Sequence, residues 1–112
     1  ALKLTMPASV FSRSTECHNQ DKVSMGTIAA RDCLRIIELT EQVAAALLIT
    51  VRQAIELRMG MDAELKLSPV LADMHERLST SIPFIAEDRA LDKELRALLD
   101  EIRSDSWSLY EA

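Results

Sequence analysis

The feature that most constrains the fold is a helical pattern that continues without a proline from residue 23 to residue 58. Apolar side chains recur through it at steps of three and four residues, which predicts one long helix. At 1.5 Å per residue, some 35 residues would form a rod of about 50 Å. A compact domain of 100 residues has a radius of gyration of about 13 Å, so this rod would extend beyond a core built by its own chain.

The middle of this helix, the run "VAAALLITV" from Val43 to Val51, is apolar around its whole circumference. A helix that is apolar on all sides requires neighbours on all sides. The rest of a chain of 112 residues is too short to supply them. We therefore expect other chains, or further parts of a longer protein, to bury this helix. The run is much shorter than the roughly 20 residues of a membrane-spanning helix, so we expect no membrane partner.

Two further helices are predicted after the long one. In "LSPVLADMHERLSTSIP", Ser68 suits the N-cap and Pro69 the first helical position, and "EDRALDKELRALLDEIRS" gives the next helix. With two glycines and no strand pattern, the chain is expected to be all-α, and Gly60 is expected to end the long helix. The expected apolar faces are Val70, Leu71, Met74 and Leu78, then Leu91, Leu95, Leu98, Leu99 and Ile102. The predicted organisation is an irregular segment at 1–22, a long central helix at 23–58, and helices with a loose tail at 59–112, the tail holding Trp107 and Tyr110.

The charge balance gives no indication of a nucleic-acid partner. Thirteen basic residues against 18 acidic ones give a formal net charge of −5, which provides no basic footprint for nucleic acid.

Cys17 and Cys33 are too few for a disulfide scaffold and favour a reduced, cytoplasmic setting. Together with His18 and His75 they show no zinc-ligand spacing, so no metal is expected. The chain begins at Ala1 rather than at a methionine, and we expect a piece of a longer protein.

A run of different polar side chains, Glu16 to Lys22, lies directly ahead of the long helix. One interpretation is an elaborate N-terminal cap, since Asn19, Asp21 and Ser24 all have suitable side chains. Capping needs only one or two oxygens, however, and leaves Glu16, His18 and Gln20 unexplained. The other interpretation is a binding or catalytic site.

The stretch "HNQDKVSMGTIAARD" resembles the motif of the aromatic amino acid lyases that use a 4-methylidene-imidazole-5-one (MIO) group. This family comprises histidine, phenylalanine and tyrosine ammonia-lyases and related 2,3-aminomutases. The similarity extends from "MPAS" through "QAIELR" and more weakly beyond. The resemblance implies the C-terminal segment of a longer enzyme, part of a helical-bundle lyase fold. It also implies a homotetramer whose active-site pockets are shared between subunits.

The resemblance implies roles for four residues of the polar run. Glu16 and Gln20 are the expected catalytic residues, with Glu16 holding the substrate ammonium or accepting its proton. His18 and Asn19 are expected to line the substrate and cofactor pocket. Gln20 resembles the amide of the enzymes for phenylalanine or tyrosine, whereas histidine-specific members carry glutamate there. Cys17 and Lys22 depart from the family pattern.

The family forms its MIO group from an Ala-Ser-Gly tripeptide, which does not occur in this sequence. We therefore expect the chain alone to be inactive, with the MIO group formed in a missing N-terminal portion. The expected function is the C-terminal part of an ammonia-lyase that converts phenylalanine or tyrosine, less readily histidine, to an aryl-acrylate. The alternatives are a 2,3-aminomutase and a catalytically inactive helical oligomerisation module. The expected partners are the N-terminal portion, further copies of the protein and a small aromatic amino acid.

Overall fold

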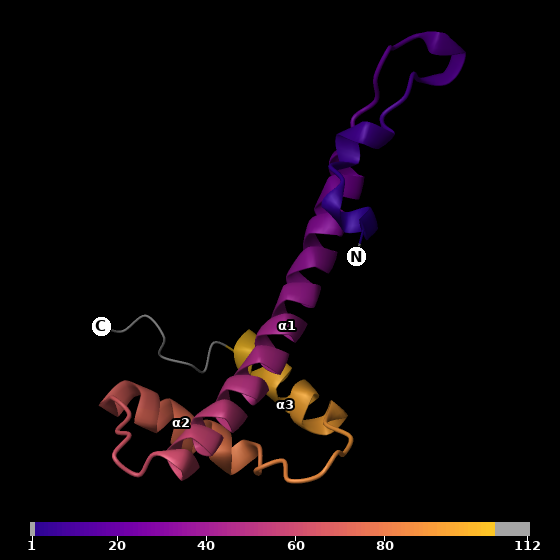
Figure 1. Ribbon diagram of the computed structural model, residues 1–112. Helices are drawn as coiled ribbons and strands as arrows, with labels where there is room; N and C mark the ends of the chain where they lie inside the picture. Colours follow the sequence, from indigo (N-terminus) through magenta and orange to yellow (C-terminus); the bar gives the residue numbers. More distant parts are fainter. Residues whose placement is uncertain (1, 105–112) are drawn as a thin grey trace. The chain divides into compact units, whose positions relative to one another are not determined.

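The computed structural model describes residues 2–104, with side chains from residue 4 onward, and its order of elements is shown in Figure 1. Three short 3-10 helices, η1 (Leu2–Thr5), η2 (Ala8–Phe11) and η3 (Glu16–His18), precede three α-helices. These are α1 (Gly26–Met61), α2 (Pro69–Ser81) and α3 (Asp92–Arg103). The described residues contain no strand, and the predicted all-α class with one long helix is confirmed. The expected tail residues Trp107 and Tyr110 lie outside the described residues.

The long helix is observed at Gly26–Met61, slightly later at both ends than the expected range 23–58. The prediction that Gly60 ends the helix is wrong. Gly60 is helical, and neither glycine of the chain has a positive φ. The helical hydrogen bonding continues past it, since the Asp62 N–H donates to the Arg58 carbonyl at 3.0 Å. A single helical glycine costs only about 1 kcal/mol, which neighbouring turns can offset.

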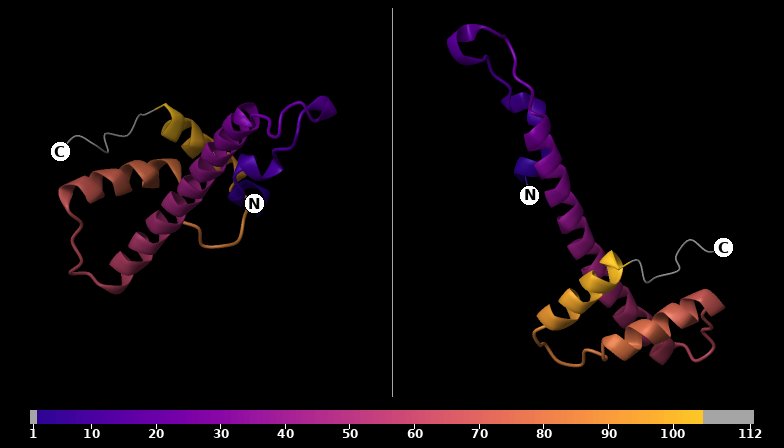
Figure 2. Two further views of the ribbon diagram at one scale, coloured as in Figure 1. Left: turned by 90° about the horizontal axis from the view of Figure 1, so that it is seen from above. Right: turned by 180° about the vertical axis from the view of Figure 1, so that it is seen from behind.

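The chain divides into two compact units, Ala1–Thr40 and Glu41–Ala112. The second unit contains the hydrophobic core, where α2 and α3 pack against the second half of α1 (Figure 2). The core residues come from all three helices and from the residue after α2. They are Ala45, Ile49, Leu78, Ile82 and Leu98.

The start of α2 follows its sequence signals. The Ser68 hydroxyl accepts the N–H of Leu71 at 3.4 Å, and Pro69 occupies the first turn. The predicted apolar face of α2 is only half right. Leu78 is buried and Met74 packs against the core, whereas Val70 is 76% exposed and Leu71 is 48% exposed. The apolar side chains in the first turn of α2 are therefore largely exposed.

The third helix begins at Asp92, later than the predicted start at Glu87, because residues 83–91 form a connecting loop. Its predicted apolar face is confirmed. Leu98 is buried, and the other four predicted residues pack around the core. The Gln53 side chain of α1 fixes the loop by donating to the Ile85 carbonyl at 3.0 Å and accepting the Ile85 N–H at 3.1 Å.

Ion pairs join the helices at the margin of this core. The Arg103 guanidinium of α3 contacts the Glu41 carboxylate of α1 at 2.7 Å, and Arg77 of α2 lies 3.6 Å from Glu101. Arg52 of α1 is buried, with 4% of its surface exposed, and pairs with Glu56 one turn later at 2.5 Å. A buried guanidinium requires such a partner, because an uncompensated charge would cost several kcal/mol.

A row of apolar side chains on α1 stays uncovered within the second unit. Val43, Leu47 and Val51, spaced four residues apart, are 67%, 59% and 42% exposed. Residues at this spacing lie on one face of a helix. The expectation that neighbours from outside this chain bury the long helix stays a prediction.

Candidate functional site

The polar run lies on a hairpin-like loop of the first unit, formed by residues 12–23. Figure 1 shows its two limbs leading to a tip beyond the start of α1. At the base, the Ser12 hydroxyl donates to the Val23 carbonyl at 2.7 Å and accepts the Val23 N–H at 3.2 Å. The same N–H also donates to the Arg13 carbonyl at 3.1 Å. A serine hydroxyl can do both, since it has one donor and two acceptor lone pairs.

A second closure lies nearer the tip. The Thr15 N–H donates to the Gln20 carbonyl at 3.0 Å, and the Gln20 N–H donates to the Thr15 hydroxyl at 2.9 Å. The Thr15 carbonyl accepts the His18 N–H at 3.1 Å and thereby forms the short turn of η3. Thr15 therefore links the two limbs of the loop that carries Glu16, His18, Asn19 and Gln20.

The tip contains two adjacent left-handed residues. Cys17 has φ 55° and ψ 21°, and His18 has φ 55°. This conformation costs an L-residue about 1–2 kcal/mol, so a pair of them requires support from surrounding bonds. The Ser14 hydroxyl lies 3.0 Å from Nδ1 of His18 and supplies one such contact.

All four predicted site residues are brought together on this loop. Glu16, His18, Asn19 and Gln20 are exposed, whereas the hydroxyl residues Ser12, Ser14 and Thr15 are half-buried. The limb of hydroxyl side chains thus points inward, and the polar run presents its carboxylate, imidazole and amides outward. Such a loop can offer hydrogen bonds and a negative charge to a group that meets it from outside.

The capping interpretation explains only a small part of the run. Of the three proposed caps, Ser24 contacts the first turn of α1, where its hydroxyl accepts the Gly26 N–H at 3.4 Å. Asn19 lies in the tip, and its N–H donates to the Glu16 carbonyl at 3.4 Å.

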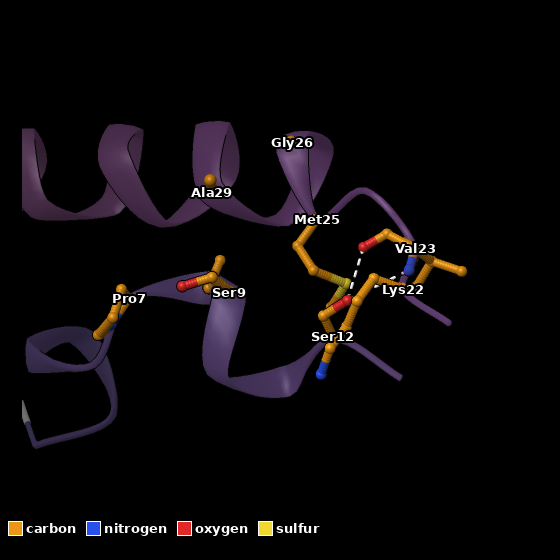
Figure 3. Close-up of a pocket in the computed structure, with 9 residues that line it drawn as sticks. Pro7, Ser9, Ser12, Lys22, Val23, Met25, Gly26 and Ala29 are labelled. Atoms are coloured by element: carbon orange, nitrogen blue, oxygen red, sulfur yellow. Dashed lines mark hydrogen bonds between the residues drawn. The ribbon is translucent and has the colours of Figure 1, made fainter. Parts of the chain in front are cut away.

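A pocket of about 600 Å³ adjoins the base of the loop, between residues 7–12 and the first turns of α1 (Figure 3). Its lining includes Pro7, Ser12, Lys22, Val23, Met25 and Ala29. Lys22, which departs from the family pattern, thus faces the pocket, while the predicted site residues Glu16 to Gln20 do not line it. Figure 3 shows the two Ser12–Val23 hydrogen bonds at the edge of this pocket.

Sequence reasoning missed the three hydroxyl residues that shape the loop. They lie in the stretch "SRST", within the segment 1–22 that is predicted only to be irregular. Its usable signal is local: Ser and Thr side chains hydrogen-bond nearby backbone groups and so build turns. Which backbone groups they bind depends on the limb that returns from the tip, and that register is not evident from composition.

A sequence profile of the family described as aromatic amino acid lyase matches residues 1–80, which include the loop and all of α1. This chain belongs to the aromatic amino acid lyase family. The resemblance drawn from "HNQDKVSMGTIAARD" is therefore confirmed.

Individual relatives of this family agree with the profile. The chain is 37% identical over 105 residues to the tyrosine ammonia-lyase of Cereibacter sphaeroides, covering 94% of this chain and 20% of that enzyme. It is 33% identical over 104 residues to a histidine ammonia-lyase of Geobacillus, covering 93% and 20%. The crystal structure of histidine ammonia-lyase from Trypanosoma cruzi superposes with a TM-score of 0.76 at 26% identity, over 94% of this chain and 20% of that one. The chain thus spans about a fifth of the length of these relatives.

The described residues show no metal cluster and no membrane-spanning helix. No three His, Cys, Asp or Glu side chains among residues 2–104 are grouped so as to hold a metal ion. Within the same residues, no helix has the length and apolar character needed to cross a membrane.

Proposed function

We propose that this chain forms the C-terminal helical part of an ammonia-lyase that acts on an aromatic amino acid, phenylalanine or tyrosine in the first instance. The observation that carries the proposal is the family match over residues 1–80, because it includes the whole polar loop. The relatives are named for tyrosine and for histidine, so the assay must include both substrates. The preference for a phenyl ring rests on Gln20, a neutral amide.

In the proposed reaction, the exposed loop supplies polar groups to a pocket completed by other parts of the enzyme. The Glu16 carboxylate would hold the substrate ammonium or accept its proton. The Gln20 and Asn19 amides would donate hydrogen bonds to the cofactor or substrate, and His18 would line the same pocket. The side chains of all four are exposed, so they are available to a group that approaches the tip.

The proposed cofactor is the MIO group, and the donor set of the loop fits it. MIO is an uncharged ring with a carbonyl oxygen, which suits the neutral amides of Asn19 and Gln20, while the carboxylate of Glu16 suits the substrate amine. When bound, the group supplies the electrophile that allows ammonia to leave. Its Ala-Ser-Gly precursor is absent from this sequence, so we propose that another part of the enzyme forms it and that the 112 residues alone are inactive.

We also propose that the enzyme is a homotetramer in the cytoplasm. The exposed row Val43, Leu47 and Val51 supports burial of α1 against other helices, because a contiguous apolar patch of this kind commonly marks an interaction surface. Cys17 and Cys33 are both free and exposed, which suits a reducing compartment.

A chimera tests the proposed function. This chain replaces the matching fifth of the Cereibacter sphaeroides tyrosine ammonia-lyase, and the ultraviolet absorbance of the aryl-acrylate product is followed with phenylalanine, tyrosine and histidine. Glu16→Ala and Gln20→Ala should each lower kcat about a hundredfold, since single acid-base or hydrogen-bonding groups contribute on that scale. Glu64→Ala, an exposed carboxylate in the loop after α1, is the matched control and should leave kcat unchanged.

The alternative of an inactive helical oligomerisation module is favoured by the same exposed row on α1 together with the departures at Cys17 and Lys22. The chimera separates the two functions. A tetrameric chimera without turnover on any of the three amino acids would support the module, whereas β-amino acid products would indicate aminomutase chemistry. Unchanged turnover in both Glu16→Ala and Gln20→Ala would show that the assigned catalytic roles are wrong.

A further inference from the structure

Thr15 makes more hydrogen bonds across the polar loop than any of the four residues assigned to the site. Its N–H donates to the Gln20 carbonyl at 3.0 Å, its hydroxyl accepts the Gln20 N–H at 2.9 Å, and its carbonyl accepts the His18 N–H at 3.1 Å. Both backbone groups of Gln20 are thus bound to one residue. Thr15 itself is half-buried, while Glu16 to Gln20 are exposed.

The hydroxyl of Thr15 takes a place that a backbone carbonyl would fill in an ordinary antiparallel pair. In such a pair, facing residues exchange two backbone hydrogen bonds. Here the Thr15 carbonyl turns toward His18 to form η3, so it does not accept the Gln20 N–H. The side-chain oxygen accepts it instead. A residue without a hydroxyl at this position would leave the Gln20 N–H without its partner.

The left-handed tip makes this closure more important. Between Thr15 and Gln20, the chain reverses through Cys17 and His18, both at φ 55°. Such a conformation persists only where surrounding contacts enforce it. The contacts that enforce it here are the Thr15–Gln20 pair and the approach of the Ser14 hydroxyl to Nδ1 of His18 at 3.0 Å. Opening the pair would let the tip relax and would move Glu16 and Gln20 together.

We propose that Thr15 is a positioning residue: through its hydroxyl it fixes the backbone of Gln20 and thereby aims the Gln20 amide and the Glu16 carboxylate at the reacting groups. The kinetic part of this inference rests on the proposed ammonia-lyase function. The structural part, closure of the loop by Thr15, does not.

Amide hydrogen exchange on the full chain tests the structural part. Thr15→Val keeps the β-branched shape and removes only the hydroxyl, so the Gln20 N–H should exchange roughly three- to tenfold faster. Thr15→Ser, which keeps the hydroxyl, should exchange as the parent does. Thr40→Val is the matched control, because it removes a threonine hydroxyl bound to the Ile36 carbonyl at 2.8 Å on α1. Equal Gln20 exchange in the parent and in Thr15→Val would overturn the inference.

Steady-state kinetics of the chimeric lyase test whether Thr15 acts through Gln20. Thr15→Val should lower kcat roughly tenfold with little change in KM, and Thr15→Ser should restore it. In a Gln20→Ala background, Thr15→Val should lower kcat less than it does in the parent, because the Gln20 amide is gone and only the Glu16 carboxylate is still positioned through Thr15. A full additional loss in that background would show that Thr15 does not act through Gln20.

Hydrogen exchange and kinetics together distinguish a failure of the proposed function from a failure of the proposed role of Thr15. If the parent chimera has no turnover, the proposed function fails, and the exchange of Gln20 still decides whether Thr15 closes the loop. If Gln20 exchange rises in Thr15→Val while kcat stays at the parent value, the loop closure is right and the positioning role is wrong. Far-UV circular dichroism of each variant confirms that α1, α2 and α3 are still formed.

Discussion

Different kinds of interaction stabilise each of the two units of this chain. In the second unit, Ala45, Ile49, Leu78, Ile82 and Leu98 form a buried apolar core. In the first, none of residues 4–40 is buried, and the loop of the polar run is closed by hydroxyl groups bound to the backbone. Apolar burial is non-directional, whereas a hydrogen bond fixes one atom against another.

The difference shows which interaction stabilises each part of the chain. Full burial of one Leu or Ile side chain contributes about 1.5–3 kcal/mol, so a few such residues can hold three helices together. A hydrogen bond contributes about 0.5–1.5 kcal/mol net, enough to select one loop conformation but not to support a domain. Hydrogen bonds of this kind can therefore hold the polar groups of the loop in one arrangement without a buried core.

The largest expected effect is the loss of a core side chain from the second unit. Leu98 of α3 is 2% exposed, so Leu98→Ala should lower the free energy of unfolding by about 2–5 kcal/mol through lost burial and the cavity left behind. Urea unfolding of the full chain, followed by far-UV circular dichroism, measures this loss.

Leu71→Ala is the matched control, because it makes the same substitution at a site on α2 that is 48% exposed. It should change the free energy of unfolding by about 0.5 kcal/mol or less. A loss in Leu98→Ala as small as that in Leu71→Ala would break the comparison, since it would show that α3 does not contribute a buried core residue.

A smaller, local effect is expected in the first unit. Ser12→Ala removes the hydroxyl that donates to the Val23 carbonyl and accepts the Val23 N–H. The Val23 amide should exchange a few-fold faster, since it keeps its bond to the Arg13 carbonyl, and the local cost should be about 1 kcal/mol. The urea midpoint of the helices should stay at the parent value. Ser9→Ala, an exposed serine of the same segment, is the control. A drop in the urea midpoint as large as that of Leu98→Ala would mean that the loop supports the fold.

The helices could be predicted from the sequence because their signals are local. Ser68 followed by Pro69 marks the start of α2, and the leucine spacing of α3 identified its buried face. The errors arose where tertiary context decides. Val70 and Leu71 fit the apolar pattern of α2 but lie in its largely exposed first turn. Gly60 stays helical because the hydrogen bonds of the surrounding turns continue past it.

The candidate site could be predicted in its outward residues but not in its support. Glu16 and Gln20 stood out because their side chains exceed what a helix cap requires. Ser12 and Thr15 did not, because a hydroxyl in an irregular segment has many possible partners. The partners became evident only once the two limbs of the loop were paired. The left-handed conformation of Cys17 and His18 likewise follows from that pairing rather than from their residue types.

The smallest expected effect is a pH dependence at the start of α3, in the second unit. The Arg89 guanidinium hydrogen-bonds the Glu94 carboxylate and, with the Glu94 backbone N–H, holds the pKa of this carboxyl below its ordinary value of 4.5. Because the pKa is lower in the folded chain, the pair stabilises the fold above about pH 4.5, and this contribution is lost as the pH falls through the folded pKa. Glu94→Gln should therefore lower Tm slightly near neutral pH, and its difference from the parent should shrink on acidification. Thermal unfolding at a series of pH values measures this, with the exposed Glu87→Gln as control for the loss of a carboxylate. A difference that grows toward low pH would have the wrong sign and would show that the ion pair with Arg89 does not stabilise the second unit.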